Sequence, residues 1–426
     1  MPNDEHRGPV LNAARQEWRN GWRLVLASSM GFSFFSVMMS ATGLFMEPLS
    51  QAFGWSRTLL SSGPSIASGS QALLGPLFGV LVDRYGTRRL VLPGVVLTMA
   101  SIASFALLDG SSKLWISLWL CFGLVSVSIK STGWTTAVVG YFSASRGLAL
   151  ALTLGGTAIA QTLVPPLGNW LITQFGWRAA FVWLALGWGG LTLLFCVLFF
   201  HDQNDNARVQ ARSKERRKKN SGTPLTGLTV RQAMRHSALV RVAISNFIVM
   251  LFTMGLTVHL FPILTEAGVS RDNAAWLIAL GGISAIVGKL VTGVLTDHFK
   301  PNWIGGITLG IAGVVFLLLL DGIRTYPFII LAMIVNGYAQ GTKTQITGYL
   351  TAGYAGIRSF GAIYSVMAAL MALAAGLGPL VAGLIYDRSG GYGPFLILGA
   401  IGCGLAGLLV LTLPAFPQEA DAESSE

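Results

Sequence analysis

Long apolar runs alternate with short polar connections along the whole chain, and this alternation predicts its architecture. A helix needs roughly 20 apolar residues to cross the hydrocarbon core of a bilayer, and runs of that length recur throughout. Membrane strands would instead show period-two alternation, which these runs lack. The sequence therefore predicts an all-α membrane protein with twelve transmembrane helices, near 22–48, 59–82, 89–108, 114–142, 147–172, 178–200, 238–265, 272–296, 303–320, 327–354, 359–385 and 393–413.

Composition and charge placement add an orientation. The chain is 53% hydrophobic and 11% charged, whereas a soluble domain carries about 25% charged residues. The densest basic cluster is ARVQARSKERRKKN (207–220), between the sixth and seventh helices. Lys and Arg gather in cytoplasmic loops, so we expect a multi-pass protein of the inner (plasma) membrane with both termini in the cytoplasm. A solvated linker explains the cluster better than nucleic-acid binding does.

The basic loop divides the chain into two halves that repeat. The expected domains are a cytoplasmic N-terminal segment (1–21), a six-helix bundle (22–200), the basic loop (201–236), a second six-helix bundle (237–414) and a cytoplasmic tail (415–426). Residues that correspond between the halves include Arg57 with Arg271 and Asp83 with Asp297, both 214 positions apart, and Lys130 with Lys343, 213 apart. Parallel six-helix repeats are typical of a transporter whose halves rock about a central site.

A motif after the second helix carries a family resemblance. GVLVDRYGTRR (79–89) resembles the signature loop between helices two and three of the major facilitator superfamily, and GVLTDHFK (293–300) is a weaker copy. The resemblance implies that the glycine lets helices approach closely, that the aspartate caps and pairs, and that the basic residues face the cytoplasm. The conformational-gating motif implied in this way comprises Gly79, Asp83, Arg84, Gly86, Arg88, Arg89 and Asp297.

The first helix suggests a narrower resemblance. GFSFFSVMMSATGLFMEPLSQAFGWSR (31–57) is similar to the first helix of the monocarboxylate and oxalate–formate branch. That branch has a carboxylate-binding arginine in helix eight, and the matching residue here is Lys289. The chain departs from the animal monocarboxylate carriers at Met38 and Met39, where they have a lysine, and at Ala285, where they have an aspartate. Their proton-coupling scheme is therefore not transferred to this chain.

Three lysines lie within apolar helices. An ionised lysine at mid-helix costs about 2.5–3.5 kcal/mol on insertion scales. Lys130, in SVSIKSTGW (126–134), lies roughly 18–24 Å from either end of its predicted helix, too far to reach water. Deep carboxylates are almost absent from the sequence. Lys130, Lys289 and Lys343 therefore predict a water-filled cavity that attracts anions, with packing or gating pairs as the alternative.

Polar neighbours extend this hypothesis. Trp134 follows Lys130 by four residues and is expected on the same helical face. A polar stripe on helix ten should face protein or water rather than lipid. The predicted substrate-binding residues are Lys130, Lys343, Lys289, Trp134, Gln340, Asn336, Thr347 and Asn246. His259 and Glu47 are the candidates for proton coupling, although His259 lies off the weaker helix-seven stripe and could equally be an ordinary hydrogen-bonded histidine.

These features favour a secondary transporter of small organic anions, either mono- or dicarboxylates or aromatic acids. It would work by alternating access, with proton symport or exchange for a counter-anion. An exporter of drugs or amphipathic metabolites, an uptake system for a larger anionic nutrient such as a vitamin, and a membrane sensor with a transporter fold are the alternatives.

Chemistry other than transport finds little support. The sequence contains no GxxxxGK[ST] motif, no Ser/His/Asp constellation at one depth and no metal-ligand spacing among Cys121, Cys196 and Cys403. We expect no enzyme activity, no cofactor and no metal. The expected partners are the organic anion, the proton or counter-anion and the lipid bilayer, without nucleic acid, and the expected state is a monomer.

Overall fold

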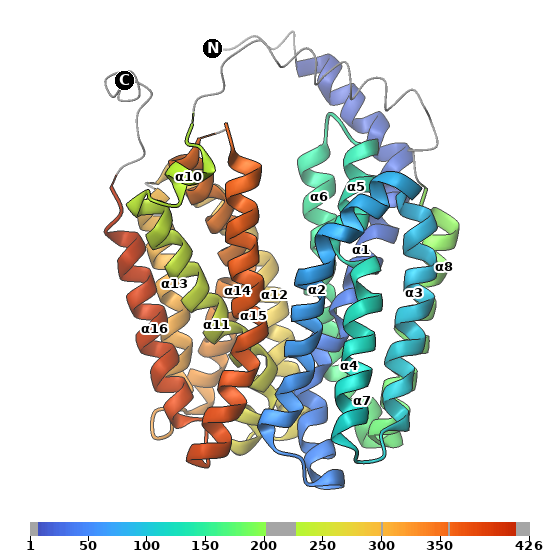
Figure 1. The fold of residues 1–426 in the computed structure, drawn as a ribbon, viewed down its shortest axis with the longest axis vertical. Helices are drawn as coiled ribbons and strands as arrows, with labels where there is room; N and C mark the ends of the chain where they lie inside the picture. Colours follow the sequence, from blue (N-terminus) through green and yellow to red (C-terminus); the bar gives the residue numbers. More distant parts are fainter. Residues whose placement is uncertain (1–6, 202–226, 300, 357, 415–426) are drawn as a thin grey trace. The chain divides into compact units, whose positions relative to one another are not determined.

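The described part of the chain is almost entirely helical (Figure 1). The computed structural model describes residues 7–201, 227–299, 301–356 and 358–414. Its α-helices are α1 (Arg7–Phe53), α2 (Arg57–Tyr85), α3 (Thr87–Ala103), α4 (Ser112–Ser126), α5 (Ser131–Tyr141), α6 (Arg146–Leu154), α7 (Gly156–Trp183), α8 (Gly189–Phe199), α10 (Val230–Ala233), α11 (Ser237–Glu266), α12 (Arg271–His298), α13 (Pro301–Leu318), α14 (Tyr326–Ala355), α15 (Phe360–Ser389) and α16 (Gly393–Leu411). Helices suit a bilayer because each one satisfies its backbone polar groups internally.

Each predicted transmembrane segment is mostly helical in the structure. Within the described residues, nine helical stretches are long and apolar enough to cross a membrane. One of them, Arg146–Phe199, has 54 residues, which is roughly 80 Å at 1.5 Å per residue and too long for one crossing. Gly176, at φ 79° and ψ 163°, interrupts it between the predicted helices 147–172 and 178–200. The prediction of an all-α membrane protein with twelve spanning helices in two bundles is confirmed.

The chain forms two compact units whose boundaries differ from the predicted bundles. Unit 1 contains Met1–Ala41 and Ser70–Thr223, and unit 2 contains Thr42–Gly69 and Pro224–Glu426. The end of α1 and the start of α2 thus belong to unit 2. Two glycines explain this grouping, because a Cβ on Gly43 would lie 2.8 Å from the Val258 carbonyl oxygen, and one on Gly383 would lie 2.8 Å from that of Arg57. The loop boundary at 201–236 falls mostly outside the described residues and stays a prediction.

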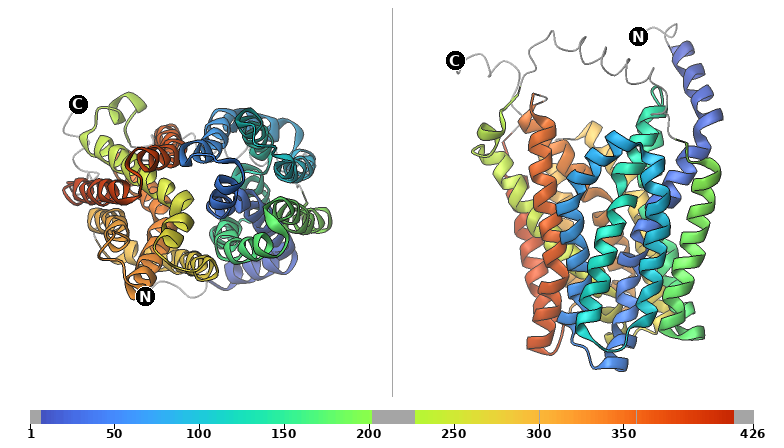
Figure 2. Two further views of the ribbon diagram at one scale, coloured as in Figure 1. Left: turned by 90° about the horizontal axis from the view of Figure 1, so that it is seen from below. Right: turned by 45° about the vertical axis from the view of Figure 1, so that its right-hand side comes forward.

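Small residues set the helix packing inside each unit. In unit 2, α13 packs on α16, α12 on α14 and α11 on α15; in unit 1, α3 packs on α4 and α8. The left view of Figure 2 shows most helices of each unit nearly end-on. Close approach at glycine is the usual way for membrane helices to associate, because lipid gives no hydrophobic drive toward contact.

Candidate substrate site and conformational pairs

The polar stripe of α14 meets α11 around Lys343. The Lys343 side chain is 6% exposed, and its Nζ donates hydrogen bonds to Thr253 Oγ1 at 2.9 Å and to Gln340 Oε1. Gln340 in turn donates from Nε2 to Thr257 Oγ1 at 2.6 Å. An ammonium has three donors, so these two bonds leave one donor for a further acceptor. The predicted stripes of helices seven and ten do lie against each other.

Two more predicted residues form the next layer of this cluster. Thr347 Oγ1 donates to Asn246 Oδ1 at 2.5 Å, and Asn246 Nδ2 donates to the Val242 carbonyl oxygen at 2.8 Å. Asn336 lies seven residues before Lys343 on α14 and is 8% exposed. The structure thus joins Lys343, Gln340, Thr347 and Asn246 through direct or shared contacts between α11 and α14.

Glycines hold α14 against α12 and fix the direction of the stripe. A Cβ on Gly337 would lie 2.1 Å from the Gly281 carbonyl oxygen, and one on Gly341 would lie 2.2 Å from that of Ala285. Neither position can accept a side chain without moving backbone. Lys289 follows on α12, half-buried. It is four residues beyond Ala285, so it projects near the face that packs on α14.

Lys130 occupies a break in a helix that the sequence predicts to be continuous. α4 ends at Ser126, a 3₁₀ turn covers Val127–Ile129, and Lys130 is extended at φ −68° and ψ 166° before α5 begins at Ser131. Its half-buried ammonium faces α2, since a Cβ on Gly75 would lie 3.9 Å from Nζ. The first amides of a helix have no partner within that helix. A cation and the start of a helix, both favourable to anions, therefore lie together in unit 1.

Trp134 has a different place from the predicted one. The expectation that it shares a helical face with Lys130 is wrong, because the chain is not helical at Lys130. Trp134 is fully buried, and its indole Nε1 donates to the Ile129 carbonyl oxygen at 2.7 Å. A Cβ on Gly31 would lie 2.1 Å from the Trp134 ring. The indole thus closes over the break and packs it against α1.

The three lysines share one electrostatic property. Ion pairs among the described residues include Arg57 with Glu266, Arg271 with Glu47 and Arg324 with Asp321, and none of these three pairs includes a lysine. A buried charge without an opposite charge is costly unless water or a ligand compensates it. That these deep cations lack an opposite charge stays a prediction.

A set of ion pairs occupies what we call the loop-distal end of unit 2, which comprises residues 44–61, 259–271 and 386–392. Arg57 Nη2 lies 3.3 Å from Glu266 Oε1, and Arg271 pairs with Glu47 and also donates to the Leu44 carbonyl oxygen at 3.2 Å. Arg57 and Arg271 correspond in the sequence repeat, so each half supplies an arginine to a glutamate of the other half.

The same end contains a capping carboxylate that sequence reasoning missed. Asp387 accepts from the backbone amides of Arg57 at 3.0 Å and Thr58 at 2.8 Å, and so caps the start of α2. A carboxylate at a helix N-terminus is stabilised by the unpaired amides and the helix dipole. The repeated arginine was the available signal for this region, but its glutamate and aspartate partners are distant in sequence.

His259 joins four segments at the loop-distal end. It is fully buried. Its Nε2 lies 2.8 Å from Ser61 Oγ and 3.1 Å from the Pro379 carbonyl oxygen, and its Nδ1 lies 2.8 Å from Tyr392 Oη. Ser61 Oγ donates to the Arg57 carbonyl oxygen, so a neutral ring with hydrogen on Nε2 satisfies every contact. This arrangement favours the hydrogen-bonded histidine over the proton carrier, the two alternatives that the sequence left open.

The predicted gating motif is only partly described. The side chains of Asp83 and Asp297 lie outside the described residues. Arg88 donates from Nη2 to the Val197 carbonyl oxygen at 3.2 Å, and Arg84 stacks over the Tyr85 ring at 5.4 Å. Gly86 precedes α3 at φ 83° and Arg89 is exposed. A Cβ on Gly79 would meet no described atom within 4 Å, so no described residue packs closely against that glycine.

The fold and these clusters define a class of protein. The chain forms two helical units, and its sequence contains a repeat. Polar and cationic groups lie within its apolar helices. These features are typical of a secondary membrane transporter. Comparison with known families agrees: the model of the Major Facilitator Superfamily matches residues 26–270 and 242–426. The chain belongs to that superfamily.

Individual relatives indicate which branch of the superfamily the chain resembles. It is 24% identical over 400 residues to monocarboxylate transporter 13 of Bos taurus, covering 93% of this chain and 90% of that protein. It is 25% identical over 374 residues to monocarboxylate transporter 12 of Mus musculus, covering 80% and 74%. The resemblance to the monocarboxylate branch is thus supported, and the relatives are transporters.

Solved structures support the fold. A D-xylose–proton symporter matches with a TM-score of 0.72 at 16% identity, covering 93% of this chain and 98% of that one. The peptide transporter POT matches with a TM-score of 0.70 at 15% identity, covering 92% and 93%. At such low identity the likeness concerns the fold alone.

Proposed function

We propose that this transporter carries small organic anions, mono- or dicarboxylates in the first instance, by alternating access. The observation that carries the proposal is Lys343, a buried ammonium whose described partners Thr253 and Gln340 are neutral oxygens. Two of its three donors are used, and neither of these two described partners carries an opposite charge. A bound carboxylate would supply both an acceptor and the opposite charge.

Lys130 provides independent support from unit 1. Discontinuous membrane helices commonly form substrate sites, and the N-terminal ends of their half-helices face anionic groups. The interruption at Lys130 combines such an end with a cation in one place. The resemblance to proteins named monocarboxylate transporters points to the same substrate class. We propose further that Lys289 contributes a third cation, as the branch resemblance implies.

Energy would come from a proton gradient by symport or from exchange of one anion for another. A ligand drives the change of conformation only through its different affinity for the two states. A carboxylate that neutralises a lysine in one state more completely than in the other meets that requirement. We place the protein in the inner membrane with its basic loop and both termini in the cytoplasm, and we propose no catalytic activity, cofactor or metal.

Counterflow in proteoliposomes tests the proposal directly. Vesicles with purified protein are loaded with one unlabelled acid and given the same labelled acid outside, across a series that includes formate, acetate, lactate, oxalate and benzoate. We expect saturable accumulation for at least one acid, and none for the matching amides or for an organic cation. Accumulation of cations or neutral amphipathic compounds, without any acid, would overturn the anion proposal in favour of the exporter.

A further inference from the structure

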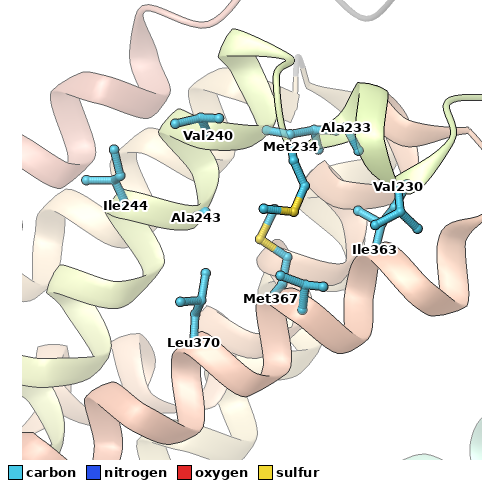
Figure 3. Close-up of a pocket in the computed structure, with 11 residues that line it drawn as sticks. Val230, Ala233, Met234, Val240, Ala243, Ile244, Ile363, Met367 and Leu370 are labelled. Atoms are coloured by element: carbon cyan, nitrogen blue, oxygen red, sulfur yellow. The ribbon is translucent and has the colours of Figure 1, made fainter.

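Unit 2 contains an apolar groove that transport of a small anion does not explain. It lies between α10, the start of α11 and the start of α15, with a volume of about 130 Å³ (Figure 3). All eleven lining residues are apolar, and Met234 of the segment after α10 lies beside Met367 of α15 in Figure 3. An apolar cavity of about 150 Å³ can take up a benzene molecule, so this groove has room for part of a hydrocarbon chain.

The groove is built into the fold. The Thr229 side chain and Gln232 cap α10 reciprocally, and the Leu228 amide donates to the Ala355 carbonyl oxygen at 2.8 Å. These contacts hold α10 across the ends of α14 and α15. Further along, a Cβ on Gly378 would lie 2.1 Å from the Leu251 carbonyl oxygen, so α11 and α15 touch there. The groove occupies the separation between that contact and α10.

Its walls are open to the surroundings. Met234 is 62% exposed and Ile244 is 47% exposed. The groove lies at the ends of helices that cross a bilayer, and its entirely apolar lining is chemically suited to lipid chains. A hydrocarbon chain is thus the occupant that matches its lining.

Exposed arginines lie beside the lining residues in the sequence, and we call these arginines the rim of the groove. Arg231 and Arg235 flank the lining residues Val230 and Met234, and Arg358 lies shortly before α15; all three arginines are exposed. The sequence contains no Asp or Glu from 227 to 250 or from 355 to 371. Basic pockets between membrane helices bind anionic lipid headgroups. A hydrocarbon lining with these arginines beside it therefore matches an amphiphile with a negative head.

The adjoining basic loop cannot serve as this occupant. Residues 207–220 carry the same charge as the rim and include a single apolar side chain larger than alanine, Val209. Like charges at the rim would oppose binding of this segment there. We propose that the groove binds an anionic phospholipid, with an acyl chain along Val240, Ile363 and Leu370 and the headgroup phosphate on Arg231 and Arg235.

The experiment measures lipid binding without transport, on full-length protein stripped of lipid in a neutral detergent. Native mass spectrometry compares dioleoyl phosphatidylglycerol with dioleoyl phosphatidylcholine, which has the same chains. We expect phosphatidylglycerol to bind with at least tenfold higher affinity. The double variant Arg231→Gln/Arg235→Gln should lower that affinity roughly 25-fold, because each of the two basic residues near a lipid headgroup contributes a factor of about five.

Two further variants separate the groove from general surface charge. Ala243→Phe fills the groove without changing charge, and Val366→Phe does so from the opposite wall in case the first variant misfolds. Both should reduce phosphatidylglycerol binding. Arg388→Gln removes an exposed arginine from the far end of α15 and is the matched control, expected to bind like the parent.

The outcomes decide the proposal. Loss of binding in the arginine variant and in a groove-filling variant, with Arg388→Gln unchanged, supports it. Equal affinity for phosphatidylglycerol and phosphatidylcholine would show that the groove binds bulk lipid without selecting a negative headgroup. A phosphatidylglycerol preference that the arginine variant removes and both groove-filling variants retain would assign binding to surface charge alone. Either of the last two results overturns the proposal.

Discussion

Lys343 Nζ donates to Thr253 Oγ1 over 2.9 Å, so the most deeply buried cation that we consider for the substrate is held by a neutral hydroxyl of the facing helix. Thr253 Oγ1 already donates to the Val249 carbonyl oxygen at 2.6 Å. Its lone pairs thus remain directed to the lysine. The pair positions the ammonium without neutralising it, which leaves the charge available to a ligand.

Replacing Lys343 with methionine should separate binding from stability. Methionine keeps most of the volume and removes the charge, so the unfolding temperature of the empty protein should stay unchanged or rise. Affinity for the transported acid should fall at least tenfold, or about 1.4 kcal/mol. Thermal unfolding without ligand measures the stability of the empty protein, and isothermal titration together with the ligand-induced thermal shift measures the affinity. Lys113→Met, at an exposed lysine, is the matched control, and a large loss of empty-state stability would show that Lys343 has a structural role.

Lys130 and Lys343 should prove energetically coupled if both serve the same anion. We expect each single methionine variant to weaken binding, and the double variant to lose less than the sum, because residues that share a ligand are not independent. A double-mutant cycle on the dissociation constant gives the coupling energy, expected at about 0.5–3 kcal/mol. Strict additivity would assign the two lysines to separate sites.

Lys289 offers a test of the branch resemblance. If Lys289 has the role of the branch's carboxylate-binding arginine, the Lys289→Arg variant should retain part of the transport rate. The Lys289→Gln variant should lose nearly all of it. Initial rates in proteoliposomes at saturating and low substrate distinguish a binding defect from a folding defect. Lys113→Gln is the control for loss of a positive charge. Equal rates for the two Lys289 variants would show that no charge is needed there.

The pair between Glu47 and Arg271 should tolerate exchange of its charges better than loss of one. The side chains of Glu47 and Arg271 are 38% and 30% exposed. Each single change, Glu47→Arg or Arg271→Glu, should therefore lower the free energy of unfolding by about 1 kcal/mol or less. Each should also slow transport. The double exchange should recover part of both. Thermal unfolding and transport rates measure this, with Asp321→Asn in the exposed Asp321–Arg324 pair as the neutral control. Failure of the double exchange to recover anything would mean that the pairing itself is unimportant.

His259 should behave as a structural cross-link. Replacement by asparagine leaves Ser61 and Tyr392 without their buried partner, and we expect a loss of about 1–3 kcal/mol. Tyr392→Phe removes only the hydroxyl and should lose less. Proton-driven uptake relative to anion exchange, measured with and without an imposed pH gradient, should keep the parent ratio. A stable His259→Asn variant that exchanges anions but no longer responds to the gradient would make His259 the proton carrier.

The sequence by itself determined the helices, because each apolar run is long enough to span a bilayer and must satisfy its own backbone in lipid. It also identified Lys130, Lys289 and Lys343, because a cation in an apolar run stands out wherever the helix packs. The stripe of Gln340, Lys343 and Thr347 followed from helical periodicity, and its contact with α11 is observed.

Only the tertiary structure decided features that depend on residues far apart in the chain. The break at Lys130 is held by Trp134 and by packing against α1 and α2, which no local pattern encodes. Asp387 caps α2 across 330 positions, and His259 joins segments from Ser61 to Tyr392. The sequence shows which side chains are polar. The hydrogen-bond partners of these side chains depend on which helices pack together. That packing depends on glycines whose contacts exist only in the folded chain.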